Sequence, residues 1–297
     1  MAYTNTDTNM TTSNGLSAGM QTYYNRELLR TFEPNLVHLQ FGDEHRMPPH
    51  SGLVMNMRKL IPLETNTKAL SEGDPGESVM LAETEVTVQL QQYGEYARCT
   101  DKLDLTHLDM DIMRRTKLFG DAGARSIDAV VREELAKCAN VIYANGKTSR
   151  ASLTAEDKLT SRELRKAVKT LKKNHAQTFG GYYVAIVGPD TMYDLQEDEA
   201  FVKVSQYQDK ENIYTGEVGR LFGVRLVETT EAKIFAEAGA NKADVASVIV
   251  LGQYAYGVTS LKGAKPRVIV KPAGSAGTAD PLDQISTVGW KMDGFGV

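Results

Sequence analysis

Two histidines near acidic residues are the first side chains in this sequence that could do chemistry. His45 and His50 lie close to Asp43 and Glu44, and imidazole and carboxylate groups are common metal ligands. The sequence contains neither an HExxH motif nor cysteine pairs with zinc-site spacing. Paired prolines also exclude a helix from residues 42–52. We therefore favour an irregular, solvated connector over 42–52 and predict no metal and no cofactor.

Several glycines raise the question of nucleotide binding. Residues 146–148 (Gly-Lys-Thr) resemble the end of a phosphate-binding loop, but Val141 stands where that motif needs glycine. The segment follows a predicted helix, so a helix stop at Asn145 and Gly146 explains it better. The glycines at 216, 219 and 223 do not match GxGxxG and fit turns instead. No GxSxG or SxxK nucleophile motif is present, so these patterns argue against an enzyme.

A cluster of cations marks a helix that we predict from residue 161 to about 177. The cations are Arg162, Arg165, Lys166, Lys169, Lys172 and Lys173. A nucleic-acid surface is one interpretation, but no aromatic residue lies among them to stack on bases. We favour a solvated face or a face that meets acidic residues of another subunit. The candidate acidic residues are Asp194, Glu197, Asp198 and Glu199.

Composition excludes several classes of protein. The 297 residues include 34 Lys and Arg against 38 Asp and Glu, a formal charge of −4, whereas proteins that bind nucleic acid by charge alone are usually basic. Cys99 and Cys138 do not make a disulfide framework, so we predict two buried thiols. No apolar run approaches the roughly 18 residues of a membrane span, and the N-terminal sequence does not resemble a signal peptide.

Hydrophobic periodicity predicts a mixed α+β protein. Residues 1–15 are rich in Thr and Asn and predict a mobile arm. Alternating apolar residues predict a two-stranded ribbon over 53–93. Residues 111–143 predict a long helix, which we expect to pack on C-terminal strands near Trp290. The apolar stripe of that helix consists of Ile127, Val131, Leu135, Cys138 and Ile142.

A second unit begins near Thr160, where Thr160 and Glu163 fit a capping box. Leu164, Val168 and Leu171 give the helix that follows an apolar face. The continuous apolar run at 182–187 predicts a buried strand. Further strands are predicted at 224–227, 247–251, 267–271 and 285–290.

The segment between the two ribbon strands, residues 62–82, is long for a hairpin connection. Loops of this length are usually functional or disordered. Its tip carries four charged residues, Lys68, Glu72, Asp74 and Glu77. Its apolar residues have no obvious local core; they are Leu70, Val79, Met80 and Leu81. We therefore predict that this segment serves assembly and adds little to the fold of the subunit.

Four segments, in this order along the chain, resemble the major capsid proteins of tailed bacteriophages. They are TNTKALSEG at 65–73, TGEVGRLFGVRLVETT at 215–230, SVIVLGQYAYG at 247–257 and DPLDQISTVGWK at 280–291. Together they are most similar to the family typified by the major coat protein of the Escherichia phage N-four.

The resemblance implies a mixed α+β fold of the Hong Kong 97 type. The corresponding division would be an N-terminal arm and connector at 1–50 and an extended loop at 51–93. A peripheral domain would comprise 94–160 and 258–297 and contain the spine helix at 111–143, and an axial domain would comprise 161–257. The family's loop reaches over a neighbouring subunit, so the resemblance implies intersubunit contact by Lys68, Glu72, Asp74 and Glu77.

The implied function is self-assembly, as hexamers and pentamers, into an icosahedral head shell around phage DNA. The implied partners are other copies of the chain, a separate scaffolding protein, a portal and a decoration protein, with DNA contacted only non-specifically and no membrane. The implied location is the virion, after assembly in the bacterial cytoplasm. An encapsulin-like compartment shell and a soluble enzyme of unknown type are the alternatives.

Overall fold

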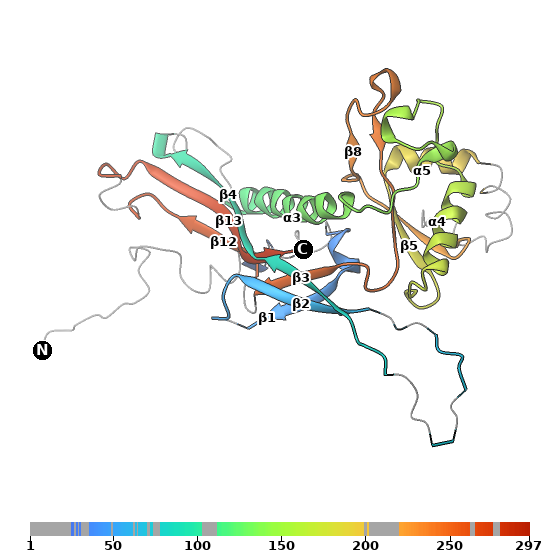
Figure 1. The fold of residues 1–297 in the computed structure, drawn as a ribbon. Coiled ribbons are helices and arrows are strands. Elements are labelled where there is room, and N and C mark those ends of the chain that lie inside the picture. Colours follow the sequence, from blue (N-terminus) through green and yellow to red (C-terminus); the bar gives the residue numbers. More distant parts are fainter. Residues whose placement is uncertain are drawn as a thin grey trace, which may run out of the picture.

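The computed structural model describes residues 25–26, 28, 30, 36–48, 50–61, 63, 65–69, 72–73, 78–102, 112–198, 201, 220–261, 265–275 and 280–297. The predicted arm at 1–15 lies outside these ranges. The described elements mix helices and strands, as the sequence predicts (Figure 1).

The helices are α3 (Ile112–Ala136), α4 (Ser161–Lys173) and α5 (Pro189–Glu197). The strands are β1 (Asp43–Met47), β2 (Val54–Leu60), β3 (Glu83–Gln89), β4 (Gln91–Thr100), β5 (Tyr183–Val187), β6 (Arg220–Leu221), β7 (Val224–Glu228), β8 (Ile234–Phe235), β9 (Val245–Ala246), β10 (Ile249–Leu251), β11 (Gly257–Leu261), β12 (Arg267–Lys271) and β13 (Ile285–Gly296). Short 3₁₀ helices lie at Leu39–Phe41, Ala144–Gly146, Arg150–Ser152 and Ala240–Lys242.

Helix α3 packs on a sheet centred on the C-terminal strand β13. This strand pairs with β4 and β12, and its last residues pair with β11. Ile127 and Val131 of α3 share one buried cluster with Trp290 and Phe295 of β13, and Leu135 is partly buried against it. The predicted packing of the helical stripe near Trp290 is therefore confirmed for these three residues.

The predicted C-terminal end of the long helix, at residue 143, is wrong. α3 ends at Ala136, and both Cys138 and Ile142 are exposed, so neither belongs to the core. Asn140 and the β-branched Val141 and Ile142 have low helix propensity, which favours an end before them. The apolar spacing continues past the end of the helix, but the side chains at Cys138 and Ile142 are exposed. The prediction of a buried thiol is confirmed only for Cys99.

The connector at 42–52 also differs from the prediction of an irregular segment. Asp43–Met47 forms strand β1, which pairs in parallel with β11. The strand ends before Pro48, whose missing N–H cannot join a ladder. The pairing partner lies more than two hundred residues away in the sequence, so local pattern cannot reveal this strand.

A second sheet has the strand order β10–β5–β7–β6. Every residue of β5 is buried, which confirms the predicted buried strand. On one face of this sheet Leu164 and Val168 of α4 pack in a cluster with Leu195 of α5. On the other face Val184 and Ile186 form a smaller cluster, against which Val37, Phe41 and, from α3, Leu135 pack.

The start of α4 is capped differently from the prediction. The Thr160 side chain makes no capping hydrogen bond. Instead, the carboxylate of Asp198 accepts hydrogen bonds from the Ser161 backbone N–H at 2.8 Å and from its hydroxyl at 2.5 Å. Glu163 accepts from Lys166 one turn later rather than closing a capping box. The helix ends at Lys173, before the predicted end near 177.

Candidate functional site

The ribbon formed by β2 and β3 projects from the body of the subunit and leads into the loop at its far end (Figure 1). Its antiparallel register places Met55 opposite Val88 and Met57 opposite Val86, which gives the ribbon one apolar face. The opposite face carries polar pairs such as Arg58 and Glu85. The predicted alternation along both strands is confirmed.

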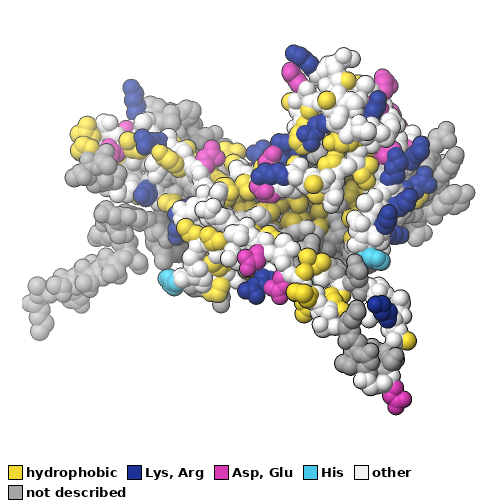
Figure 2. All heavy atoms as spheres, in the orientation of Figure 1, with side chains coloured by type: hydrophobic (Ala, Val, Ile, Leu, Met, Phe, Trp, Pro, Cys, Tyr) yellow, Lys and Arg dark blue, Asp and Glu magenta, His cyan; other side chains and the backbone are white. Residues whose placement is uncertain are grey.

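The apolar face of the ribbon is buried at its base and exposed further out. Val88 is 7% exposed, whereas Val86, two residues further along the same face, is 45% exposed. At the base, the Val88 side chain lies against Gly296 at the end of β13, where an added Cβ would come within 2.7 Å of it. Figure 2 shows hydrophobic side chains at the surface where the ribbon leaves the body.

Beyond the ribbon, every described residue from 61 to 82 is exposed. Val79, Met80 and Leu81 are apolar, and Met80 is 90% exposed. The predicted contact residues Lys68 and Glu72 are both exposed in this loop, whereas Asp74 and Glu77 lie outside the described residues. A row of exposed apolar side chains without a core in the described part of its own subunit is typical of a surface that binds another protein.

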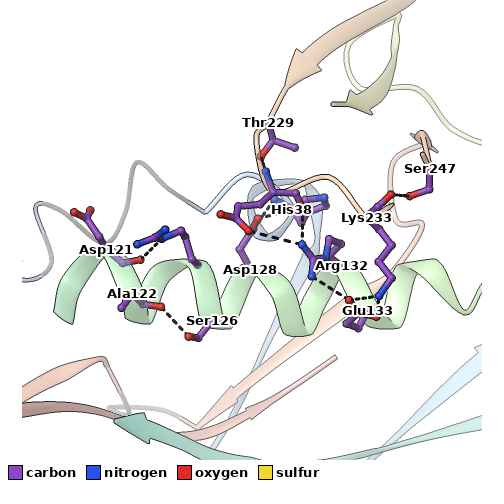
Figure 3. Close-up of polar contacts among 12 residues, drawn as sticks. His38, Asp121, Ala122, Ser126, Asp128, Arg132, Glu133, Thr229, Lys233 and Ser247 are labelled. Carbon is purple, nitrogen blue, oxygen red and sulfur yellow. Dashed lines mark hydrogen bonds and ion pairs between the residues drawn. The ribbon is translucent and has the colours of Figure 1, made fainter. Parts of the chain in front are cut away.

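A second group of functional interest lies where the two cores meet (Figure 3). His38 and Asp128 have fully buried side chains. Asp128 accepts hydrogen bonds from the His38 backbone N–H at 2.7 Å and from the His38 ring Nδ1 at 2.6 Å. The Tyr256 hydroxyl donates to the His38 carbonyl oxygen. Burial, together with the nearby Asp128 carboxylate, raises the pKa of Tyr256 above its ordinary value.

Two further contacts join α3 to the segment after β7. Arg132 donates to the Glu231 carbonyl oxygen at 2.8 Å. Lys233 donates to both oxygens of Glu133, at 2.7 and 2.8 Å. The hydrogen bond from Lys233, aided by Arg132, holds the pKa of the Glu133 carboxyl below its ordinary value. Figure 3 shows Lys233 reaching from this segment to Glu133 on α3. These contacts form a polar junction between the two parts of the subunit.

The residues first considered for metal or phosphate chemistry do not form such a site. His45 makes an exposed ion pair with Asp43 at 3.2 Å. His50 lies in a turn and is exposed. Within the described ranges, no three His, Cys, Asp or Glu side chains are grouped to hold a metal ion. Gly146 closes a short 3₁₀ turn instead of capping α3. No described helix is both long enough and apolar enough to cross a bilayer.

Comparison with known families decides between the remaining interpretations. A family model described as phage capsid protein matches residues 83–297, which include the second ribbon strand, α3, the whole sheet around β5 and every strand of the sheet around β13 except β1. The chain belongs to the phage capsid protein family. This match favours a phage capsid protein over an encapsulin-like compartment or an unidentified enzyme. No curated protein matches the sequence.

Solved phage capsids share the fold of this capsid protein. The capsid of Ralstonia phage GP4 matches with a TM-score of 0.63 and 13% identity over 100% of this chain and 92% of that chain. The capsid of cyanophage Pam1 matches with a TM-score of 0.61 and 14% identity, over 100% and 92%. The capsid of cyanophage P-SCSP1u matches with a TM-score of 0.62 and 13% identity, over 86% and 82%. The Hong Kong 97-like fold is thereby confirmed.

Sequence reasoning missed the polar junction of this capsid protein. One signal for it exists, because Asp128 lies within the apolar stripe of α3, between Ile127 and Val131. A carboxylate on a buried helix face requires a partner. The sequence does not indicate that the partner is His38, ninety positions earlier. The similarity to the N-four type and the proposed domain boundaries remain predictions.

Proposed function

We propose that this chain is the major capsid protein of a tailed bacteriophage and that its copies form a closed icosahedral shell of hexamers and pentamers around the phage DNA. The observation that carries the proposal is the ribbon, whose apolar face is buried at the base and exposed beyond it, in a chain of the phage capsid protein family. Apolar surface of this kind becomes stable when another protein covers it.

In the proposed mechanism, the loop at 62–82 lies on a neighbouring copy of the chain. Its apolar residues, Met80 and Leu81 among them, lose their exposure to water on that neighbour. The charged residues Lys68, Glu72, Asp74 and Glu77 set the orientation of the contact, because charges at an interface mainly control specificity. Repetition of such a contact around closed rotational symmetry produces a shell, and no substrate is converted.

The remaining partners follow from the same proposal. A separate scaffolding protein guides assembly, a portal occupies one vertex, and a decoration protein binds the finished shell. Assembly takes place in the bacterial cytoplasm, and the finished protein resides in the virion. The similarity to known phage capsids supports the shell and the virion, and the other partners extend it.

The experiment is to replace residues 66–80 with a short Gly/Asn turn and compare the variant with the natural chain. Thermal unfolding should remain cooperative with a similar midpoint, because the described residues of the loop are all exposed. Negative-stain electron microscopy should show closed shells for the natural chain and none for the variant. Normal shells from the variant, or failure of the variant to fold, would contradict the assignment of the loop to intersubunit contact.

A milder pair of variants controls for the size of that change. Met80→Ser/Leu81→Ser removes apolar side chains from the loop, and Leu282→Ser removes one of comparable exposure, 74%, from the β12–β13 connection. We expect the loop variant alone to lower shell yield at an unchanged unfolding midpoint. An equal loss of shells in both variants would show that the effect is not specific to the loop.

A further inference from the structure

The exposed face of α4 carries a dense array of cations. Its thirteen residues include six Lys and Arg and one carboxylate, in a chain whose formal charge is −4. At 100° per residue, the six cations fall within about one third of the helix circumference and extend about 16 Å along the axis. Leu164 and Val168 lie outside this sector and are buried. Figure 2 shows Lys and Arg side chains gathered over this part of the molecule.

The acidic residues expected to neutralise this face make other contacts within their own subunit. Asp194 and Glu197 form ion pairs with Lys158, at 2.9 and 3.7 Å. Asp198 accepts hydrogen bonds from Ser161 at the start of α4. In the described part of the subunit, these contacts hold the three carboxylates near Lys158 and at the start of α4. Glu199 lies outside the described residues, and a contact with acidic residues of another subunit stays a prediction.

Most of the cations on this face have no anionic partner in the described structure. Lys166 pairs with Glu163 at 2.9 Å. Arg165 lies over the ring of Phe222, 5.0 Å from its centre, which fixes the position of its guanidinium. The described residues offer no ion pair to the others, which are Arg162, Lys169, Lys172 and Lys173. Five of the six cationic residues are therefore exposed and available to a partner.

We propose that the exposed face of α4 binds the phosphate backbone of double-stranded DNA. Lysine is depleted at protein–protein interfaces, and four of the six cations are lysines. No large hydrophobic side chain is exposed on α4, although the core of a protein interface usually needs one. No aromatic side chain of the helix can stack on unpaired bases, which favours a duplex over a single strand.

That the bound duplex is packaged phage DNA rests on the proposed function. The affinity of α4 for a DNA duplex does not depend on that function and can be tested separately. The test uses the purified full-length chain and a short DNA duplex of mixed sequence, with binding followed by fluorescence anisotropy over a series of salt concentrations. Five phosphate contacts predict a slope of log K against log salt of about −4 to −5.

Two variants with the same change in net charge separate the helix face from the charge of the whole chain. The first replaces three exposed lysines of α4 with glutamine: Lys169, Lys172 and Lys173. The control replaces three exposed lysines outside α4 with glutamine: Lys147, Lys242 and Lys265. The α4 variant should bind at least about tenfold more weakly at low salt and reduce the slope by about 3, whereas the control should bind nearly as the natural chain does.

Thermal unfolding of both variants checks that the fold is retained, and electron microscopy checks that shells still form. Retained shells with weakened DNA binding for the α4 variant alone would support the proposal. Equal weakening in both variants, no binding by the natural chain at low salt, or stronger binding to poly-glutamate than to DNA would overturn it. Loss of shells with unchanged DNA binding would also overturn it, by making α4 a contact between subunits, and would leave the proposed function intact.

Discussion

Removal of the His38 side chain should destabilise the subunit strongly, because it leaves a buried carboxylate with one partner fewer. The Asp128 side chain has no exposure to solvent and accepts one hydrogen bond from the His38 ring and one from the His38 backbone. His38→Ala keeps the backbone bond and removes the 2.6 Å bond from the ring. Breaking a buried pair from one side costs about 3–5 kcal/mol.

Scanning calorimetry of the unassembled protein measures this loss. For a unit of this size each kcal/mol shifts the midpoint by about 2–4 °C, so we expect a fall of about 6–20 °C. The matched control is His45→Ala, which removes a histidine from an ion pair with Asp43 that is about 40% exposed on both sides. An exposed pair contributes at most about 1 kcal/mol.

A fall no larger for His38→Ala than for His45→Ala would show that the buried His38–Asp128 contact contributes no more to stability than an exposed pair does. A double-mutant cycle locates the cause. His38→Ala combined with Asp128→Ala should cost less than the sum of the two single changes, because the second change removes the carboxylate that the first leaves unpaired. Additive losses would mean that the two side chains stabilise the subunit independently, in spite of their contact.

Three further outcomes are expected. Lys233 lowers the pKa of Glu133 in the folded state, so their contact stabilises the protein above the ordinary pKa of the carboxyl and loses its effect as pH falls through the folded-state pKa. The difference in urea midpoint between Glu133→Gln and the natural chain should therefore vanish in acid. A difference that stays constant with pH would contradict this. Ile127→Ala should cost about 2–5 kcal/mol in thermal unfolding. Leu118→Ala, at a site 68% exposed on the same helix, should change the free energy of unfolding by no more than about 0.5 kcal/mol. Similar losses for the two variants would mean that Ile127 does not lie on the buried face of α3. Elemental analysis of protein purified without chelator should find no stoichiometric transition metal, and one bound equivalent would overturn that prediction.

The elements that the sequence predicts well are those with a complete local pattern. Met55 and Met57 alternate with Asn56 and Arg58, and Val86 and Val88 alternate with Thr87 and Gln89, so the ribbon and its apolar face follow from a period of two. The apolar run at 182–187 likewise predicts a buried strand, and β5 is buried throughout. In both cases the residues that decide the structure lie within a few positions of one another.

Predictions from the sequence were wrong where a distant segment decides the structure. The residues of β1 are mostly polar and show no apolar alternation, so the sequence does not predict a strand there. They form one because they pair with β11. The capping box at Thr160 is a sound local pattern, yet Asp198 supplies the acceptor instead. Ile142 continues the spacing of α3 beyond the helix, where its side chain is exposed. Each error follows from a contact, or the lack of one, that local spacing does not encode.

The polar junction and the exposed ribbon have opposite effects on the lone subunit, and a shell protein needs both. The contacts of His38, Arg132 and Lys233 join the segment before β1, α3 and the segment after β7, which fixes the two cores relative to each other. A subunit that is already ordered loses little conformational entropy on assembly, so a modest interface suffices. The ribbon can supply that interface. Complete burial of a fully exposed aliphatic side chain gains about 1.5–3 kcal/mol, and Val86, which is 45% exposed, would gain roughly half of that. Repeated in every copy of a closed shell, contacts that are weak singly become strong together, because each subunit is held by several neighbours at once.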